Sequence, residues 1–482
     1  MKMKGMAGAM LAALLLSGGT EAAALSIEEA VDLALAQNTS LQIKAKGEDT
    51  ARADLKSARG KNGFALSASG NFTVSHPDSG GHTRTGNASL SASLPLYTGG
   101  ANEANIRSGE IELDTARLAT ERERENLRYN VIKAYYDVLE AQRTVAIDQE
   151  SVDKYQAHLT NVELLYQAGS KARLDVLRSS VELANARQTL IKAQNEYEVR
   201  LIVLKNLLHL SSKEPLTLTE DFSYQPFYSP MEACVAYAVE NRKDILIDRY
   251  TLRQRELAVD MARAGYRPQV NLSASVSEER EFHPRSSDSR NYTAGVRVTW
   301  NVFDGGVTAA AVDKAQTALE VATLTLQKDT EDIDQAVRQA YYGMREAEKR
   351  LASTQAAVGE AREDYYITME KYRAGQGIML DVIDAQVALS TAEMNFASAQ
   401  YDYARYRAQV ENAAGLALGA SEEKIDPAAV AEGRVRQPGR DVSASSDYRR
   451  AQAVVDGMAG SDSADDEVVS PEQGAAGNGG TR

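Results

Sequence analysis

The feature that most constrains this chain is an internal repeat at constant spacing. Residues 166–176 read YQAGSKARLDV, and residues 372–382, which start 206 positions later, read YRAGQGIMLDV. The same spacing relates the other matched pairs: Gly99-Gly100 with Gly305-Gly306, and Tyr135-Tyr136 with Tyr341-Tyr342. A repeat of this length is a duplicated half rather than a short stacking unit of a solenoid. We therefore expect two copies of one structure.

The first 24 residues have the pattern of a secretory signal peptide. Lys2 and Lys4 precede an apolar run from Met6 to Leu16, and small residues follow up to Ala24. That run is too short to cross a bilayer as a stable helix. We expect cleavage near Ala24, so that the exported chain begins close to Leu25.

Charge and cysteine usage exclude several classes of protein. A net charge of -14 provides no basic field for nucleic acid. The mean hydropathy of -0.39, with 25% charged residues, excludes a protein made of hydrophobic membrane helices. The single cysteine, Cys234, excludes an internal disulfide and lies far from the position of a lipid anchor. It matches Val31 in the first half, which predicts a small buried residue on a helix.

Each half carries two runs in which apolar or small residues alternate with polar ones. The runs are 64–75 and 85–96 in the first half, then 270–277 and 292–302 in the second, within strand regions of about 64–97 and 268–303. Their length suits tilted membrane-spanning strands, and one face is mostly Ser, Thr and Asn. Polar loops are expected at 76–84 and 280–290, with aromatic residues near strand ends: Tyr97, Tyr292, Trp300 and Phe303. A soluble β-sandwich is the alternative, although it needs more strands.

Helical runs surround these strands. Single helices are expected at 26–59, where Ser26 and Glu29 form a capping box, and at 229–264. Long helical hairpins are expected to follow, with helices at 101–166, 174–210, 307–372 and 380–414 and tips at about 167–173 and 373–379. Helices this long are stable only when packed against neighbours.

These elements define the expected domains. The signal peptide at 1–24 is followed by repeat 1 at 25–210, a linker at 211–230, repeat 2 at 231–418 and a C-terminal segment at 419–482, largely a disordered tail. Residues 216–218 of the linker are a candidate short strand.

The order of these features resembles the TolC family of outer membrane efflux proteins. The resemblance covers about residues 25–418 and is specific in LSIEEAVDLAL at 25–35, in the paired glycines after the strands and in the Leu-Asp-Val of both tips. It implies an α+β membrane protein that forms a homotrimer. Each subunit would give four strands to a twelve-stranded outer membrane β-barrel, which a long α-helical barrel continues into the periplasm. Four strands cannot close a barrel alone, so assembly also follows from taking them as membrane-spanning.

The implied function is an outer membrane exit duct for drugs, small toxic compounds or secreted proteins, as in tripartite efflux and type I secretion. The implied partners are a periplasmic adaptor, a proton-driven or ATP-driven inner-membrane pump, and outer membrane lipid. Opening would be an iris-like movement of the periplasmic tips. The alternative from another class is a periplasmic coiled-coil structural or adhesion protein without a pore. The exported substrate is not encoded in these patterns.

Asp381 and Asp384 are the candidate selectivity gate. They lie three residues apart at the start of a helix and so share one face. Threefold symmetry would place six carboxylates around one axis, and such rings favour cations. The alternative is that Asp381 caps its helix, since it has a counterpart in Asp175. Asp384 corresponds to Arg178, so the fold common to both halves does not require a carboxylate there.

The resemblance also implies a restraint on the gate. In the family, a tyrosine at the position of Tyr372 hydrogen-bonds an aspartate at that of Asp175, while an arginine found five residues after the tyrosine is replaced here by Gly377. We expect Tyr372→Phe to raise leak less than Asp175→Ala does. The tip residues are expected to dock the adaptor, with glycines able to adopt positive φ: Gly169, Ser170, Gly375, Gln376 and Gly377.

No catalytic residue, cofactor or metal site is predicted. The five histidines have no ligand spacing, the methionines are scattered, and phosphate-binding glycine loops and nucleophile elbows are absent from the sequence. We therefore expect a protein that is not an enzyme.

Overall fold

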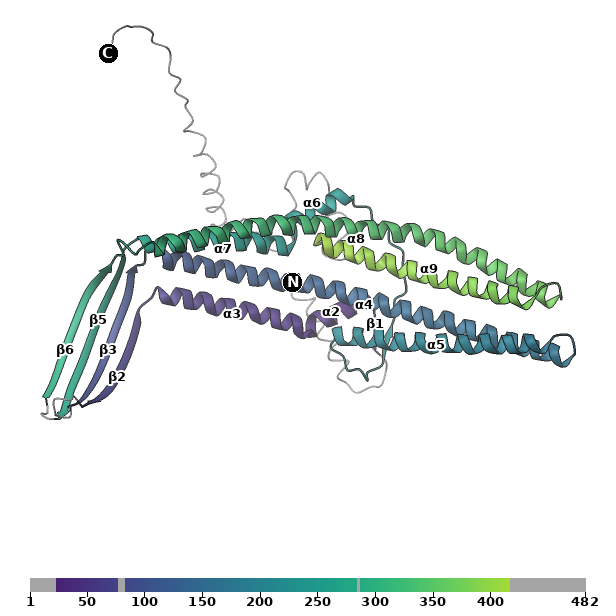
Figure 1. Cartoon of the computed structure of the whole chain (residues 1–482), viewed down its shortest axis with the longest axis horizontal. Coiled ribbons are helices and arrows are strands. Elements are labelled where there is room, and N and C mark those ends of the chain that lie inside the picture. The colour runs from purple at the N-terminus through teal and green to yellow at the C-terminus, as the bar shows by residue number, and fades with distance from the viewer. Residues whose placement is uncertain (1–22, 77–82, 284–286, 417–482) are drawn as a thin grey trace, which may run out of the picture. The chain divides into compact units, whose positions relative to one another are not determined.

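The computed structural model describes residues 23–76, 83–283 and 287–416. The predicted signal peptide (apart from its last two residues) and the predicted C-terminal tail lie outside these residues. Figure 1 shows the arrangement of the described helices and strands, which are, in chain order, β1 (Ala23–Leu25), α2 (Ile27–Gln37), α3 (Thr39–Lys61), β2 (Ala65–Ser75), β3 (Thr83–Tyr97), α4 (Ala101–Gln167), α5 (Arg173–Leu207), β4 (Leu216–Leu218), α6 (Met231–Asn241), α7 (Lys243–Arg263), the 3-10 turn η1 (Ala264–Tyr266), β5 (Gln269–His283), β6 (Ser287–Thr299), α8 (Val307–Arg373) and α9 (Met379–Ala414).

The same order of elements occurs in both parts of the chain. Helices α2 and α3, strands β2 and β3, and helices α4 and α5 are followed by α6 and α7, β5 and β6, and α8 and α9. Helices α4 and α8 each contain 67 residues, and each begins directly after a glycine with positive φ. The predicted long helices and their shorter return helices are therefore confirmed. None of the described helices is both long enough and apolar enough to cross a membrane.

The two helices that precede the strands are each broken, where we had predicted single helices. The backbone is extended at Asn38 and at Arg242, which separates α2 from α3 and α6 from α7. The Asn38 side chain accepts hydrogen bonds from the backbone of Ser40 and Leu41, at 2.9 and 3.3 Å, and so caps α3. The apolar spacing continues across the break, which explains the incorrect prediction. The capping box of Ser26 and Glu29 is present as predicted.

The four predicted long strands form one antiparallel sheet in the order β2-β3-β5-β6. Strand β5 reaches His283 and β6 begins at Ser287, so the strands replace most of the polar loop predicted at 280–290. Tyr292 was expected near a strand end, but it lies within β6 opposite Val276. The sheet is open, because β2 and β6 each have one unpaired edge within the described chain.

The strand register gives this sheet one apolar and one polar face. Residues directly opposite one another on neighbouring strands share a face. One such row across all four strands is apolar: Ala68, Leu90, Val276 and Tyr292. The adjacent row is Ser67, Ser91, Ser275 and Thr293, and its side chains point the other way. A sheet of this kind separates an apolar environment from water.

In each half, a pair of glycines lies between the second long strand (β3 or β6) and the long helix that follows it (α4 or α8). Gly99 and Gly305 have φ of 70° and 68°, which disfavours any residue with a side chain. A Cβ at Gly99 would lie 2.8 Å from the carbonyl oxygen of Ala264, whereas a Cβ at Gly305 would have no described atom within 4 Å.

These two glycines form a matched pair for mutation. We expect Gly305→Ala to lower the free energy of unfolding by about 1 kcal/mol, the cost of positive φ. Gly99→Ala should lower it by about 2–3 kcal/mol, because the backbone clash is added. Urea unfolding followed by circular dichroism measures both, and equal midpoints for the two variants would contradict the proposed close approach.

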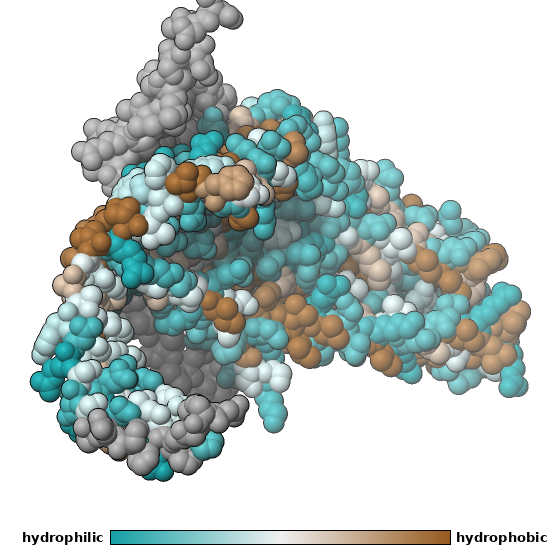
Figure 2. All heavy atoms as spheres, turned by 60° about the vertical axis from the view of Figure 1, so that its left-hand side comes forward, coloured by the Kyte–Doolittle hydropathy of each residue, from teal (hydrophilic) through white to brown (hydrophobic). Residues whose placement is uncertain are grey.

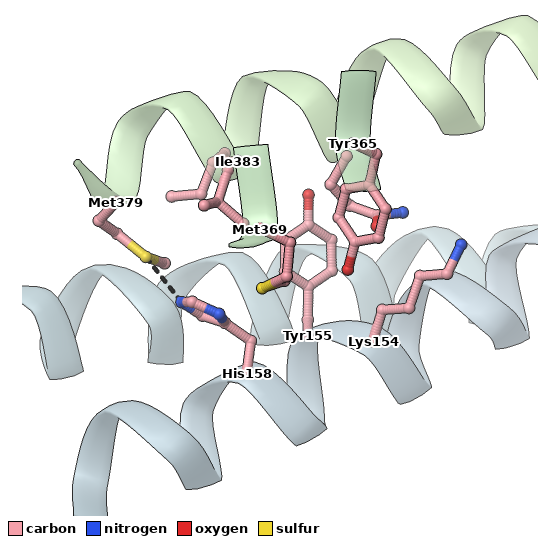
Figure 3. Close-up of a pocket in the computed structure, with 9 residues that line it drawn as sticks. Lys154, Tyr155, His158, Tyr365, Met369, Met379 and Ile383 are labelled. Carbon is pink, nitrogen blue, oxygen red and sulfur yellow. Dashed lines mark hydrogen bonds between the residues drawn. The ribbon is translucent and has the colours of Figure 1, made fainter. Parts of the chain in front are cut away.

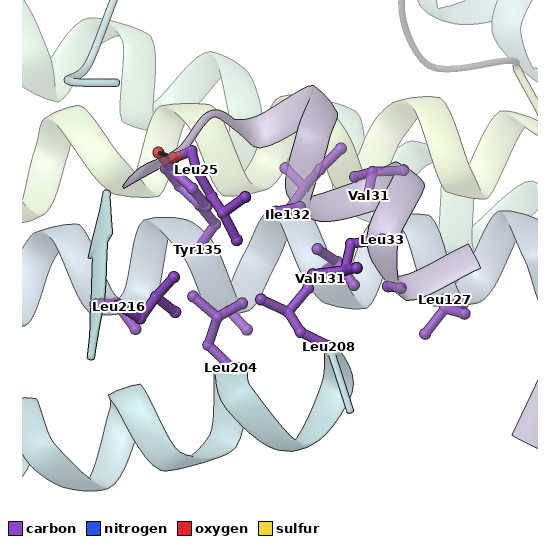
Figure 4. Packing of buried hydrophobic residues seen from close by; sticks show 14 of the residues in the cluster. Leu25, Val31, Leu33, Leu127, Val131, Ile132, Tyr135, Leu204, Leu208 and Leu216 are labelled. Carbon is purple, nitrogen blue, oxygen red and sulfur yellow. Dashed lines mark hydrogen bonds between the residues drawn. The ribbon is translucent and has the colours of Figure 1, made fainter. Parts of the chain in front are cut away.

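The main hydrophobic core lies where α2, α4 and α5 meet the short sheet of β1 and β4 (Figure 4). Strand β4 confirms the prediction for residues 216–218, and its parallel partner β1 was not predicted. Tyr135 is fully buried in this core, and its hydroxyl donates to the carbonyl oxygen of Leu25 at 2.9 Å. Tyr342, which occupies the position matching Tyr136 in the second half, is 62% exposed. Cys234 is buried on α6, as predicted.

The helices lie side by side, with α4 in contact with α3, α5, α7 and α9, and α8 in contact with α6, α7 and α9. Helix α5 therefore leaves one face open, and its exposed apolar side chains are Leu174, Leu177, Val181, Ile191, Val199, Ile202 and Val203. Helix α8 exposes Val321, Leu324, Tyr342, Tyr366 and Ile367. Figure 2 shows hydrophobic patches on the helices and at the end of the sheet next to them.

Candidate gate at the hairpin tips

Two turns join the long helices at their ends away from the sheet (Figure 1). We call α4–α5 the first hairpin and α8–α9 the second hairpin. Gly169 and Gly375 have φ of 76° and 73°, as predicted. The Gly169 N–H donates to the Tyr166 carbonyl at 2.9 Å, and the Gly375 N–H donates to the Tyr372 carbonyl at 3.1 Å. Left-handed glycines thus end both long helices.

Gly377 differs from the prediction of positive φ. It is not among the described glycines with positive φ. A Cβ at this position would lie 3.2 Å from the Tyr372 backbone nitrogen, so close approach to α8 is what favours glycine there. The neighbouring tip residues are exposed, as docking would require: Gly169, Ser170, Gly375 and Gln376.

Asp381 and Asp384 lie in the first two turns of α9, and both are exposed. The Asp381 carboxylate accepts a hydrogen bond from the Ile378 N–H at 3.4 Å, so it also supports the start of α9. Asp384 is one of the charges, secondary to burial, that raise the pKa of Tyr155 to about 12. The two carboxylates therefore lie in solvent near the tip.

The expected hydrogen bond between Tyr372 and Asp175 is not formed. The Tyr372 hydroxyl is buried and has no hydrogen-bond partner among the described residues. Burial, with a smaller contribution from the Asp175 charge, raises the pKa of this phenol. The carboxylate thus acts on Tyr372 through its charge and not through a hydrogen bond.

Other contacts hold the Tyr372 ring. The Lys171 ammonium lies 4.2 Å from the ring centroid, a cation–π contact, and the His158 ring centroid lies 5.4 Å away. The His158 Nε2 atom in turn lies 2.7 Å from the Met379 sulfur. We call Lys171, His158, Tyr372 and Met379 the Tyr372 cluster. It joins the first hairpin, which supplies Lys171 and His158, to the second.

Our sequence analysis missed Lys171 and His158. In the second tip, Gly377 stands where the family has an arginine. Lys171 lies 206 residues before Gly377 and therefore occupies the matching position in the first tip. That comparison was available in the sequence. His158 had no such signal, because it lies 214 residues before Tyr372 in the chain and approaches it only through packing.

A small cavity lies beside the cluster, between α4, α8 and α9 (Figure 3). Its volume is about 10 Å³, close to the space that one water molecule needs. Its lining includes His158 and Tyr155 from α4, Tyr365 and Met369 from α8, and Met379 from α9. His158 is 6% exposed, and this burial lowers the pKa of its imidazole.

Polar contacts continue along the α4–α9 interface away from the tip. The hydroxyls of Ser151 and Ser390 lie 2.8 Å apart, and the Gln386 amide donates to Ser390 at 3.1 Å. Further along, the Arg405 guanidinium donates to Asp137 and Glu140 at 2.9 and 2.6 Å. An interface with many polar groups separates at a lower cost than an apolar one, since water satisfies these groups after separation.

The architecture is matched by known proteins. The family model described as "Outer membrane efflux protein" matches residues 30–208 and 235–416. Outer membrane efflux protein BepC of Brucella suis biovar 1 is 21% identical over 396 residues, which cover 81% of this chain and 86% of BepC. Alkaline protease secretion protein AprF of Pseudomonas aeruginosa is 24% identical over 338 residues, covering 68% and 69% of the two chains.

Among solved structures, the Campylobacter jejuni CmeC outer membrane channel superposes with a TM-score of 0.71 at 18% identity, covering 85% of this chain and 89% of CmeC. This likeness shows a shared fold. The two segments that the family model matches lie on either side of residues 209–234 and include nearly all of the long helices and the four-stranded sheet. This chain therefore belongs to the outer membrane efflux protein family, and it is an outer membrane protein.

Proposed function

We propose that this protein is the homotrimeric exit duct of an export system, built from two duplicated halves. The observation that carries the proposal is the two-faced sheet of four strands with two unpaired edges. An open edge in lipid leaves backbone groups without partners, so copies of the chain must join edge to edge until a barrel closes. Three copies, the number that the family resemblance implied, would give twelve strands.

The helices support the same assembly. Apolar side chains are exposed along α5 on one side of the described helices and along α8 on the other. In a closed ring, the α8 side of one copy would cover the α5 side of the next. This arrangement is heterologous and closes by rotation, as in other cyclic oligomers.

The hairpin tips form the proposed gate. Asp381 and Asp384 from three copies would form a ring of six carboxylates around the axis, which favours cations. The Tyr372 cluster would hold the second hairpin against the first in the closed state. Opening would move the second hairpin outward, and the polar α4–α9 interface lowers the cost of that movement.

The exposed tips are the proposed docking site for a periplasmic adaptor, which would couple the duct to an inner-membrane pump. The relatives are named for efflux in one case and for protease secretion in the other, so their names do not single out one cargo. We propose that the duct passes small toxic compounds or secreted proteins according to the attached pump.

Two measurements test the duct itself. Purified protein should migrate as a heat-resistant trimer from outer membrane fractions and should conduct ions across a planar bilayer. A periplasmic coiled-coil structural or adhesion protein would do neither. A trimer that never conducts, including after tip mutations, would refute the duct.

The partner is tested by photocrosslinking in cells from a reactive amino acid at Gln376, with Val199 on the open face of α5 as the control position. Capture of an adaptor from Gln376 alone is expected. If a well-expressed trimer captures none, docking at the tips is refuted.

The contacts in the Tyr372 cluster predict how substitutions there change leak through the closed channel. Tyr372→Phe should leave leak at the wild-type level, because the hydroxyl makes no hydrogen bond and the ring contacts remain. Tyr372→Leu removes the ring contacts with Lys171 and His158, and a loss of about 1.4 kcal/mol would raise the open fraction roughly tenfold. Asp175→Ala should fall between the two, since it removes only a charge. Single-channel conductance and antibiotic uptake measure the effect.

Tyr166→Leu is the matched control, because Tyr166 occupies the same position in the first hairpin and is 43% exposed. It should behave as wild type. An equal rise in leak in Tyr372→Phe and Tyr372→Leu would show that the hydroxyl, which both variants lack, and not the ring restrains the gate.

A further inference from the structure

Three soft donor atoms converge on the small cavity beside the Tyr372 cluster. The imidazole of His158 comes from α4, the thioether of Met369 from the end of α8, and the thioether of Met379 from the start of α9 (Figure 3). Met369 and Met379 are ten residues apart across the second tip, whereas His158 lies more than 200 residues earlier, so the sequence did not group the three donors. We propose that they form a binding site for a soft monovalent cation, Cu⁺ or Ag⁺.

The chemistry of the donors selects this class of ion. Thioether and imidazole ligands favour soft ions such as Cu⁺, whereas Mg²⁺ and Ca²⁺ require oxygen ligands and structural Zn²⁺ sites use thiolates or several imidazoles. The lining of this cavity contains neither a carboxylate nor a thiolate. A charge of one is also less costly to bury than a charge of two.

Two of the three donors are already in contact, and they must separate before an ion can bind both. The His158 Nε2 atom already lies 2.7 Å from the Met379 sulfur, and both residues are almost fully buried, with exposed fractions of 6% and 4%. Met369 lines the same cavity. Methionine side chains have three flexible bonds, so both thioethers can adjust to admit an ion.

The surrounding charges do not oppose a cation. Lys154 lines the cavity but forms an ion pair with Glu150 at 2.9 Å. Lys171 lies over the Tyr372 ring, and its effect on His158 is opposed by that of Asp175. These two positive and two negative side chains therefore offset one another. A bound ion would connect the first hairpin to both helices of the second.

The test is a titration of the purified detergent-solubilised protein with silver nitrate in chloride-free buffer, followed by calorimetry and by elemental analysis of bound silver. The thiol of Cys234 also binds silver, so every sample carries Cys234→Ala. The parent should bind one Ag⁺ per chain. His158→Gln, Met369→Leu and Met379→Leu should each weaken binding at least roughly tenfold, about 1.4 kcal/mol.

Met394→Leu is the matched control, because Met394 lies 15 residues beyond Met379 on α9, about 22 Å along the helix. It should bind silver as the parent does. Methionine-to-leucine changes conserve volume, so the two site variants keep the test valid even if His158→Gln does not fold. An absence of binding in the parent, or unchanged binding in any one of the three site variants, would overturn the three-donor site. The inference goes beyond the proposed function and does not rest on it, since ion binding is measured without conductance.

Discussion

Replacing both Asp381 and Asp384 by asparagine is expected to abolish block of the channel by hexaamminecobalt(III). In the proposed trimer, six carboxylates face a trivalent cation at the narrowest point, and the double variant leaves none. We expect the blocking affinity to fall at least roughly 100-fold, the equivalent of about 2.7 kcal/mol. Block measured in planar bilayers gives this affinity. The measurement is made at low ionic strength, because salt screens the carboxylates and weakens cation binding.

The single variants distinguish a role of Asp381 in cation block from its role in supporting the start of α9. Asparagine is also a good helix-capping residue, so Asp381→Asn keeps the hydrogen bond from Ile378 that supports α9. Asp364→Asn, at an exposed position on α8, is the matched control and should keep the wild-type block. Undiminished block in the double variant would show that the cation binds elsewhere.

Replacing Tyr135 by alanine is expected to cause the largest loss of stability, about 3–5 kcal/mol. The side chain is fully buried where β1, β4 and α4 meet, and its removal leaves a cavity. Its hydroxyl also accepts a hydrogen bond from the Glu220 N–H at 3.2 Å. Tyr135→Phe should cost about 2 kcal/mol, because it removes this bond and the one to Leu25 and leaves the Glu220 N–H without its partner.

Tyr341 is the internal control, since it occupies the matching position in the second half. It is only partly buried, and its hydroxyl donates to the Ser229 carbonyl at 3.3 Å and accepts from the Arg345 guanidinium at 3.0 Å. Arg345 keeps its bonds to Glu348 and to the Phe227 carbonyl when this hydroxyl is lost. Tyr341→Phe should cost about 0.5–1 kcal/mol. Urea unfolding monitored by circular dichroism compares the variants. Equal losses in the two phenylalanine variants would contradict the inferred role of the β1–β4 sheet.

Sequence patterns predicted most of the secondary structure because long segments of this chain have a single clear period. The alternation in β2, β3, β5 and β6 and the glycines at the tips are local signals, and local backbone preferences decide them. Strand lengths were predicted less well. The charged residues Arg280 and Asp288 fell in the predicted polar loop, but they pair across β5 and β6 at 2.8 Å and extend the hairpin.

The order of the strands and long helices, the left-handed glycines that end the long helices and the two-faced strands were thus determined by the sequence alone, because each depends on neighbouring residues. Only the tertiary structure decided what meets across the hairpins. It left the Tyr372 hydroxyl unpaired, placed Lys171 over the ring and brought His158 to Met379 and Met369. These contacts join residues from separate helices, and they depend on how each helix is rotated and aligned against the next. Such rotation and alignment follow from packing along the whole interface, which no single stretch of sequence contains.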